Sequence, residues 1–194
     1  WSSDVCSSDL LYHDNINNIP LDLSLELLFA ADELFLERLK TMSAVNITSQ
    51  FQKFNFQEFQ SLQDKLDCNA YDLIRASWQT RCDKLEQHVT KMIAYNLSEI
   101  FNLEIERQKL SDLIKESAER IKERQDTDTI ELVDDVRYYL TKKYAINEEI
   151  GSFDPTFSSD KNTDDINLYK TALLQYEKDV EIIDYLLDQL HLDA

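Results

Sequence analysis

The scarcity of glycine and proline limits the folds open to this chain more than any other feature. Among 194 residues, Gly151 is the only glycine, and Pro20 and Pro155 are the only prolines. Ordinary usage would give roughly 13 glycines in this length. Phosphate-binding loops, tight βα turns and hairpin turns need glycine where φ is positive or where backbone must approach closely. The composition therefore argues against P-loop, Rossmann and all-β folds and favours helices with few turns.

The strongest periodic pattern lies near the C-terminus, in a helix predicted over residues 164–192. Its apolar residues recur at alternating steps of three and four, which keeps one stripe of a helix facing a partner. We call this stripe the seam; it comprises Ile166, Tyr169, Leu173, Tyr176, Val180, Ile183, Leu187 and Leu190. The seam predicts helix-on-helix packing.

The seam can be used in two ways, within the chain or between chains. In a parallel self-pair, Asp179 at a g position would meet Asp184 at the following e position, and like charges oppose a homodimer. Tyr169 and Tyr176 are bulky for a two-stranded zipper. Four further apolar residues widen the stripe: Leu168, Leu174, Ile182 and Leu186. Burial in an intrachain bundle is favoured, and an intermolecular coiled coil remains the alternative.

Other stretches also have helical periodicity. We expect a first helix over 20–42, a short Phe-rich helix over about 51–66, and a helix through Tyr144 after a capping Asp128. In the last of these, Ile130, Val133, Val136 and Leu140 are expected to face inward. Asn69, with Asp72 three residues later, predicts a new helix start. From Asn69 to Arg124 no proline or glycine intervenes, which predicts one long helix or two collinear ones with a break near Asn96–Ser98. Residues 145–163, with Gly151 and Pro155, are predicted to be a linker.

The predicted fold is all-α: an elongated up-and-down helical bundle, resembling a coiled coil, of four to five helices with one long central helix. Residues 1–10, WSSDVCSSDL, resemble a translated sequencing-adaptor remnant, so we expect them to be non-native. The chain lacks an initiating Met, and we expect its true N-terminus to be missing. Residues 11–194 are predicted to form a single helical-bundle domain or a fragment of one.

The charge balance limits the classes of partner that the chain can bind directly. A net charge of −18, from 38 acidic and 20 basic side chains, disfavours direct binding to nucleic-acid phosphates and to anionic membranes. No run of 18 apolar residues could span a bilayer. The three cysteines form no CxxC pair, which indicates a reducing, cytoplasmic setting.

No motif predicts catalysis, cofactor binding or a metal site. His88 has no carboxylate at helical ligand spacing, and His191 with Asp188 lacks a second liganding pair. Asp134 and Asp135 are adjacent on a helix and point about 100° apart, so they cannot share one site as a catalytic dyad does. Glu148–Glu149 is a doublet of the same kind. Cys68 and Cys82 are better described as buried small apolar residues.

The sequence therefore predicts a non-enzymatic α-helical scaffold or protein–protein interaction module, part of a larger chain or assembly, with protein partners bound through helix packing. One alternative is a helical accessory segment of a nucleotide-driven or nuclease machine whose catalytic domain lies elsewhere. Another is an acidic nucleic-acid mimic that occupies a basic groove. The sequence does not indicate the biological process, the partner or the oligomeric state.

Overall fold

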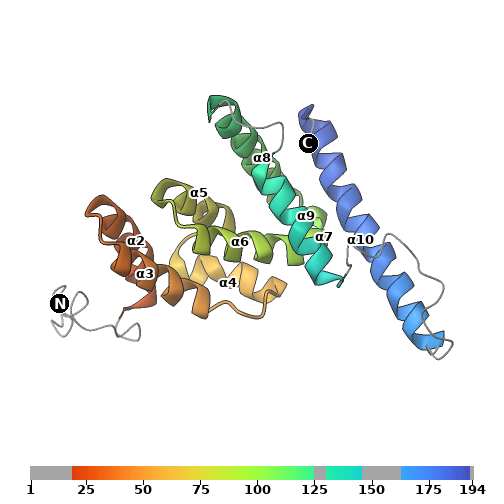
Figure 1. Cartoon of the computed structure of the whole chain (residues 1–194), viewed down its shortest axis with the longest axis horizontal. Helices are drawn as coiled ribbons and strands as arrows, with labels where there is room; N and C mark the ends of the chain where they lie inside the picture. The colour runs from red at the N-terminus through yellow and green to blue at the C-terminus, as the bar shows by residue number, and fades with distance from the viewer. Residues whose placement is uncertain (1–18, 125–129, 146–162, 193–194) are drawn as a thin grey trace, which may run out of the picture. The chain divides into compact units, whose positions relative to one another are not determined.

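The structure, a computed structural model, describes residues 19–124, 130–145 and 163–192, with the side chains of 121–124 and 163–169 left out. Those residues are all-α, as predicted, and contain no strand. The elements are η2 (Leu21–Leu23, a 3-10 turn), α2 (Ser24–Glu33), α3 (Glu37–Ser49), α4 (Phe56–Leu66), α5 (Ala70–Thr80), α6 (Asp83–Tyr95), α7 (Leu97–Asn102), α8 (Glu104–Arg124), α9 (Glu131–Lys143) and α10 (Thr163–Leu190) (Figure 1). The described ranges thus hold nine α-helices, more than the four or five predicted.

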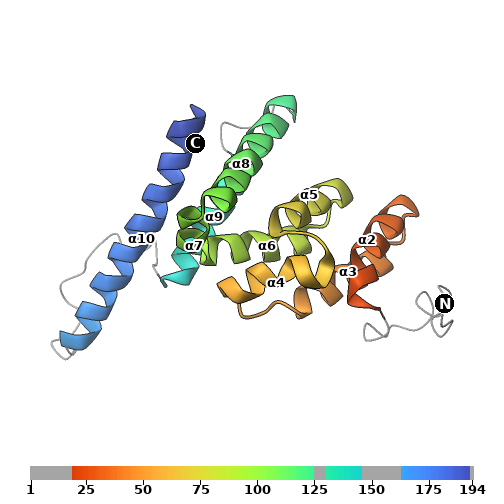
Figure 2. The same cartoon turned by 180° about the vertical axis from the view of Figure 1, so that it is seen from behind.

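The helices form two compact units, which divide between Ile93 and Ala94 in the last turn of α6. In the first unit, α2 packs along α3 and also contacts α5. In the second unit, α10 packs against α7, α8 and α9 (Figure 2). Our prediction of one domain over residues 11–194 stays a prediction.

The prediction of a long central helix over residues 69–124 is wrong, because this segment forms four helices, α5, α6, α7 and α8. Helix α5 stops at Arg81, which adopts the left-handed conformation at φ 51°, and the Cys82 amide donates back to the Ser77 carbonyl over 2.9 Å. The other interruptions are at Asn96 and at Leu103, whose ψ of 114° is extended. Because none of these residues is glycine or proline, composition does not indicate these breaks, and only the break near Asn96 agrees with the prediction.

The first helix predicted over 20–42 is also interrupted. Helix α2 ends at Glu33, α3 begins at Glu37, and Phe35 between them has a φ of 55°. Left-handed helix ends are usually marked by glycine, and the apolar stretch from Leu21 to Leu39 contains none. The sequence therefore does not indicate this turn.

Other local predictions are confirmed. The Asn69 side chain accepts a 2.9 Å hydrogen bond from the Asp72 amide and starts α5. Asn55, a cap that the sequence analysis does not predict, starts α4 in the same way, through the Glu58 amide at 2.8 Å. The four apolar residues expected to face inward are buried, Ile130 directly before α9 and Val133, Val136 and Leu140 within it.

Each unit has an apolar interior. In the first unit the largest fully buried side chains are Tyr71, Phe51, Leu28, Ile47, Leu62, Leu73, Ile74, Leu85, Met92 and Ile93. In the second unit the buried side chains include Leu97, Ile100, Leu110, Leu113, Ile114 and Leu140. Full burial of such a side chain contributes about 1.5–3 kcal/mol, so these interiors dominate the stability of each unit.

Some predictions concern residues that the structure does not describe. Residues 1–10 and all but the ends of the 145–163 linker are among them, as is the Glu148–Glu149 doublet. Across the described helices, none has both the length and the apolar character required to cross a bilayer.

Candidate functional site

The seam lies on α10, whose bounds agree with the predicted C-terminal helix. Of its eight residues, Ile183 and Leu187 are buried in the second unit. Four more are partly buried: Leu173, Tyr176, Val180 and Leu190. The side chains of Ile166 and Tyr169 lie outside the described residues.

The inner face of α10 also contains a buried charge, which the sequence reasoning missed. Asp179 has no exposed surface. Its Oδ1 accepts a short hydrogen bond from the Ser98 hydroxyl of α7. Its Oδ2 accepts from the Lys143 ammonium at 2.9 Å and from the Tyr144 hydroxyl at 2.8 Å. One carboxylate thus joins α10 to α7 and to the end of α9.

Asp179 and its three donors, Ser98, Lys143 and Tyr144, form a cluster that stabilises a buried negative charge. A buried carboxylate is costly unless it is paired and hydrogen-bonded, and here both oxygens have donors. Burial, followed by the hydrogen bond to Asp179, raises the pKa of Tyr144 above its ordinary value, so the phenol stays protonated and donates. This arrangement positions helices, since its three donors connect α10 to α7 and to the end of α9.

A signal for Asp179 was present in the sequence. The widening of the seam by Leu186, seven residues later, indicates that the g side of α10 faces inward, and Asp179 shares that side. The homodimer considered in the sequence analysis would instead put Asp179 at the solvated flank of the helix pair. The exposed Arg137–Asp184 pair, at 3.0 Å, shows where the flank of α10 is solvated.

The outer face of α10 carries two exposed apolar residues, Leu174 at 58% and Tyr185 at 47% exposure. They are eleven residues apart, close to three full turns, which places them on the same face about 16 Å apart. We call this face the outer stripe. The Tyr185 ring also lies nearly perpendicular to the Phe101 ring of α7, at a centroid distance of 5.6 Å. Two further exposed apolar residues follow Phe101 in the chain, Leu103 at 43% and Ile105 at 72%.

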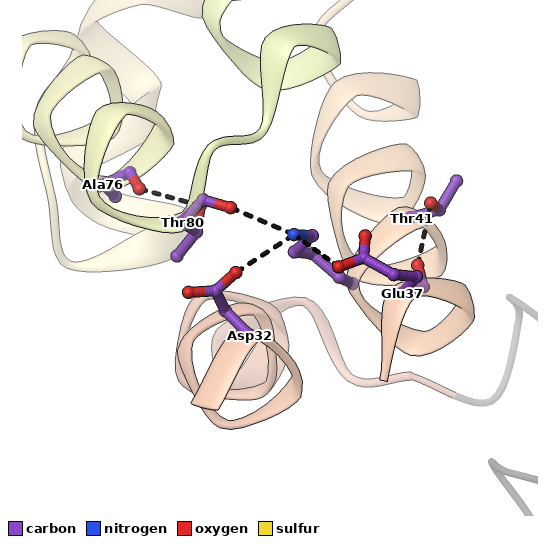
Figure 3. Close-up of polar contacts among 6 residues, drawn as sticks. Asp32, Glu37, Thr41, Ala76 and Thr80 are labelled. Carbon is purple, nitrogen blue, oxygen red and sulfur yellow. Dashed lines mark hydrogen bonds and ion pairs between the residues drawn. The ribbon is translucent and has the colours of Figure 1, made fainter. Parts of the chain in front are cut away.

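In the first unit, a buried lysine joins three elements. Figure 3 shows Asp32, Glu37 and Thr80 converging on one nitrogen, the Lys40 ammonium. Lys40 Nζ donates to Asp32 Oδ1 at 3.0 Å, to Glu37 Oε1 at 3.1 Å and to the Thr80 carbonyl at 3.1 Å. These three acceptors match the three protons of the ammonium group. The hydrogen bond to Asp32 is the largest of the effects that raise the pKa of Lys40.

The histidines and cysteines considered in the sequence have structural surroundings. His88 Nε2 lies 2.7 Å from the Phe51 carbonyl oxygen, which requires the protonated nitrogen to donate, and its ring lies 4.8 Å from that of Phe54. Burial lowers the pKa of His88. Burial also raises the pKa of the Cys68 thiol to about 11 and that of Cys82 above its ordinary value. Both thiols are free and buried, as predicted.

The acidic doublet and His191 do not converge on a shared site. Asp134 is exposed, and Asp135 is partly buried, with a pKa raised by burial and then by Glu131 and Asp134. His191 is exposed in the left-handed turn that ends α10, where its amide donates to the Asp188 carbonyl. Within the described ranges, no group of three or more His, Cys, Asp or Glu side chains is arranged to hold a metal ion.

Comparison with curated proteins finds relatives that share most of this chain. The chain is 34% identical over 187 residues to BTB/POZ domain-containing protein 3 of Schizosaccharomyces pombe. This match covers 95% of this chain and 31% of that protein. The chain is 39% identical over 140 residues to an ankyrin repeat-containing protein of Saccharomyces cerevisiae, covering 72% of this chain and 24% of that protein. The chain thus spans less than a third of the length of either relative.

No protein-family model matches the chain, and no solved structure matches it. Ankyrin repeats carry a T-P-L-H signature, whereas the two prolines of this chain follow Ile19 and Asp154. This chain therefore does not contain that signature. What the comparisons establish is a likeness between this helical segment and two longer proteins.

Proposed function

We propose that the chain is a non-enzymatic α-helical protein–protein interaction module that works as part of a larger assembly. The outer stripe carries this proposal: α10 is fixed through its inner face and presents Leu174 and Tyr185 outward from the same helix. Apolar and aromatic side chains held on a rigid element are typical of binding anchors.

The fixing of α10 supports a binding role. Ile183 and Leu187 pack inward, and Asp179 ties the same helix to α7 and α9. A helix held in this way binds a partner without a large ordering cost, because its exposed side chains are already placed. We further propose that the whole seam, including Ile166 and Tyr169, packs within a bundle of the second unit rather than in a self-paired coiled coil.

The relatives support the same class of function. Both are named for domains of the interaction type, BTB/POZ and ankyrin repeat, and the segment they share with this chain is a minor part of each. A non-enzymatic role agrees with the engagement of Asp179 and Lys40 in hydrogen bonds between helices. Direct nucleic-acid or membrane binding is not part of the proposal, given the net charge of −18. Cytoplasmic localisation remains a prediction.

The test is partner capture followed by reconstitution. The full chain would be affinity-purified from its native cells, and co-purifying proteins would be made recombinantly and titrated against it. The double variant Leu174→Asp/Tyr185→Asp should weaken binding of a reconstituted partner at least about 30-fold, the loss typical of hot-spot residues. The control Glu177→Gln/Glu181→Gln alters exposed polar residues of the same helix and should bind as the wild type does.

Two results would contradict the proposal. One is the absence of any reconstituted partner. The other is a partner that binds the double variant as tightly as the wild-type chain while circular dichroism shows both proteins folded. Light scattering on the purified chain separates self-association from binding of another protein, since a monomer at all concentrations excludes the coiled-coil alternative.

A further inference from the structure

The turn between α2 and α3 has a residue that its backbone conformation disfavours. The Phe35 amide donates to the Asp32 carbonyl at 3.1 Å, and the Leu36 amide donates to the Ala31 carbonyl at 2.7 Å. This pair of hydrogen bonds is the Schellman arrangement, in which the residue at the position of Phe35 is usually glycine. At φ 55° the Cβ of any other residue crowds the backbone, and a bulky residue is rare there.

Burial of the Phe35 ring does not offset this strain. Phe35 is 87% exposed, the highest value among the large apolar residues described. The preceding Leu34 is 66% exposed. Leu36, by contrast, packs against the cluster that contains Ala31, Leu39 and Met42. The turn is therefore anchored by one apolar residue, Leu36, and displays two others, Leu34 and Phe35, in water.

The displayed residues are held on a rigid base. Lys40 joins Asp32, in the last turn of α2, to Glu37, the first residue of α3, and so spans the turn that carries Leu34 and Phe35 (Figure 3). The third hydrogen bond of Lys40, to the Thr80 carbonyl, ties both helices to the end of α5. An aromatic side chain on a fixed turn loses little freedom on binding, which favours affinity.

The surroundings of the turn are acidic. Residues 32–38 contain three acids, Asp32, Glu33 and Glu37, and one base, Arg38. Glu33 is exposed, and 73% of the Glu37 side chain is exposed. Lys40 is directed inward and only 10% of its side chain is exposed, so its charge is not displayed at the surface. A partner that receives the apolar tip would bury these carboxylates near its rim, where basic groups complement them.

We infer that Leu34 and Phe35 form an anchor that inserts into an apolar pocket with a basic rim on a partner protein. The inference rests on the proposed interaction function and adds a second surface, in the first unit, with the chemistry of its partner. An anionic membrane would repel the acidic flank, and a second copy would bring two chains of net charge −18 together.

The substitution Phe35→Gly separates binding from folding. Glycine suits φ 55° better than phenylalanine does, so the variant should melt about 2–8 °C higher than the wild-type chain. It should also weaken partner binding about 30-fold, because it removes the anchor. Arg81→Gly is the matched control: Arg81 is exposed at the same kind of helix end, with φ 51°, so the variant should also gain stability but should keep its affinity.

The binding probe is obtained by photo-crosslinking from position 35. A photoreactive benzoylphenylalanine at that position in the full chain, expressed in its native cells, should crosslink to one protein, which is then purified and titrated with each variant. Glu33→Lys should weaken that binding, and added salt should do the same, as expected for a basic rim.

Several outcomes would overturn the inference. A lower melting temperature for Phe35→Gly would show that the ring serves folding. Equal affinity of Phe35→Gly and the wild-type chain for the crosslinked protein would overturn the anchor while leaving the proposed function intact. Crosslinks only to a second copy, to the chain's own residues or to lipid would identify a different occupant. Failure of any protein to bind the wild-type chain would reject this inference and the proposed function together.

Discussion

The Lys143 ammonium lies 2.9 Å from the carboxylate of Asp179, whose side chain has no exposed surface. Lys143 ends α9, and Asp179 lies in the middle of α10, so the pair fixes where along its length α10 meets its neighbour. Ser98 and Tyr144 complete the coordination of the carboxylate. A buried ion pair of this kind specifies an arrangement more than it adds stability, because desolvation offsets most of the attraction.

We predict that Asp179→Ala destabilises the second unit by about 3 kcal/mol. The substitution leaves the Lys143 ammonium, 21% exposed, without its carboxylate and also removes the acceptor of the Tyr144 hydroxyl. Chemical denaturation monitored by circular dichroism would measure the loss. Asp184→Asn is the control, because its pair with Arg137 is exposed and should contribute less than about 1 kcal/mol. Equal effects of the two substitutions would show that burial of Asp179 has no energetic role.

A substitution to aspartate should destabilise the protein strongly on the inner face of α10 and hardly at all on its outer face. Leu187→Asp places a carboxylate in the interior of the second unit and should unfold it, since loss of the packed side chain and burial of a charge together cost more than about 4 kcal/mol. Leu174→Asp should change the free energy of unfolding by less than about 0.5 kcal/mol, because Leu174 is exposed.

Val180→Asp tests the same distinction at a seam residue that is partly buried. If α10 were only an intermolecular zipper, Val180→Asp and Leu187→Asp would yield folded monomers instead of unfolded chains. Analytical ultracentrifugation combined with circular dichroism distinguishes these outcomes.

We predict that the first unit loses stability as the pH falls below about 6.5, through His88. Its folded-state pKa is lowered by burial, so the unfolded chain binds the proton more readily and protonation favours unfolding. The stabilisation is complete above the unfolded pKa and declines by at most about 1.4 kcal/mol per pH unit below it. Urea denaturation at pH 5.5 and 7.5 gives the difference. In His88→Gln this part of the pH dependence should vanish; an unchanged pH dependence would assign it to other groups.

Lys40→Met should destabilise the first unit by about 1–2 kcal/mol. The thioether side chain keeps the buried volume but leaves the Thr80 carbonyl without its donor, while the partly exposed carboxylates recover water. Because the pKa of Lys40 is raised, the contribution of the ammonium is complete below about 10.5 and is lost only as the pH rises through its folded-state pKa. Glu37→Gln alters the more exposed partner and should have a smaller effect, so a larger loss from Glu37→Gln would contradict the importance of Lys40.

The parts of the fold that could be predicted are those governed by periodicity and side-chain caps. The seam predicted α10, Asn69 predicted the start of α5, and the scarcity of glycine predicted an all-α chain. The breaks after α2 and α5 could not be predicted, since Phe35 and Arg81 occupy left-handed positions that residue preference assigns to glycine. Tertiary contacts, such as those of Leu36 and Lys40, hold these turns against local preference.

The candidate surfaces were less predictable than the elements. Periodicity predicted the inner face of α10. Which of its apolar residues remain exposed depends on how α7, α8 and α9 pack against the helix, and periodicity does not contain that information. Leu174 was interpreted only as a widening of the seam, and it is more than half exposed. Asp179 was interpreted as a flanking charge, although the g-side Leu186 indicated that its side of the helix faces inward.

Hydrogen exchange on the chain with and without its reconstituted partner tests whether these exposed side chains form the binding surface. We predict slower exchange on binding in the exposed part of α10 around Leu174 and in the turn at Leu34 and Phe35, with the buried α9 amides near Leu140 unchanged. Protection confined to other segments, with no change at Leu174, Tyr185 or Phe35, would contradict the assignment of these side chains to a protein-binding surface.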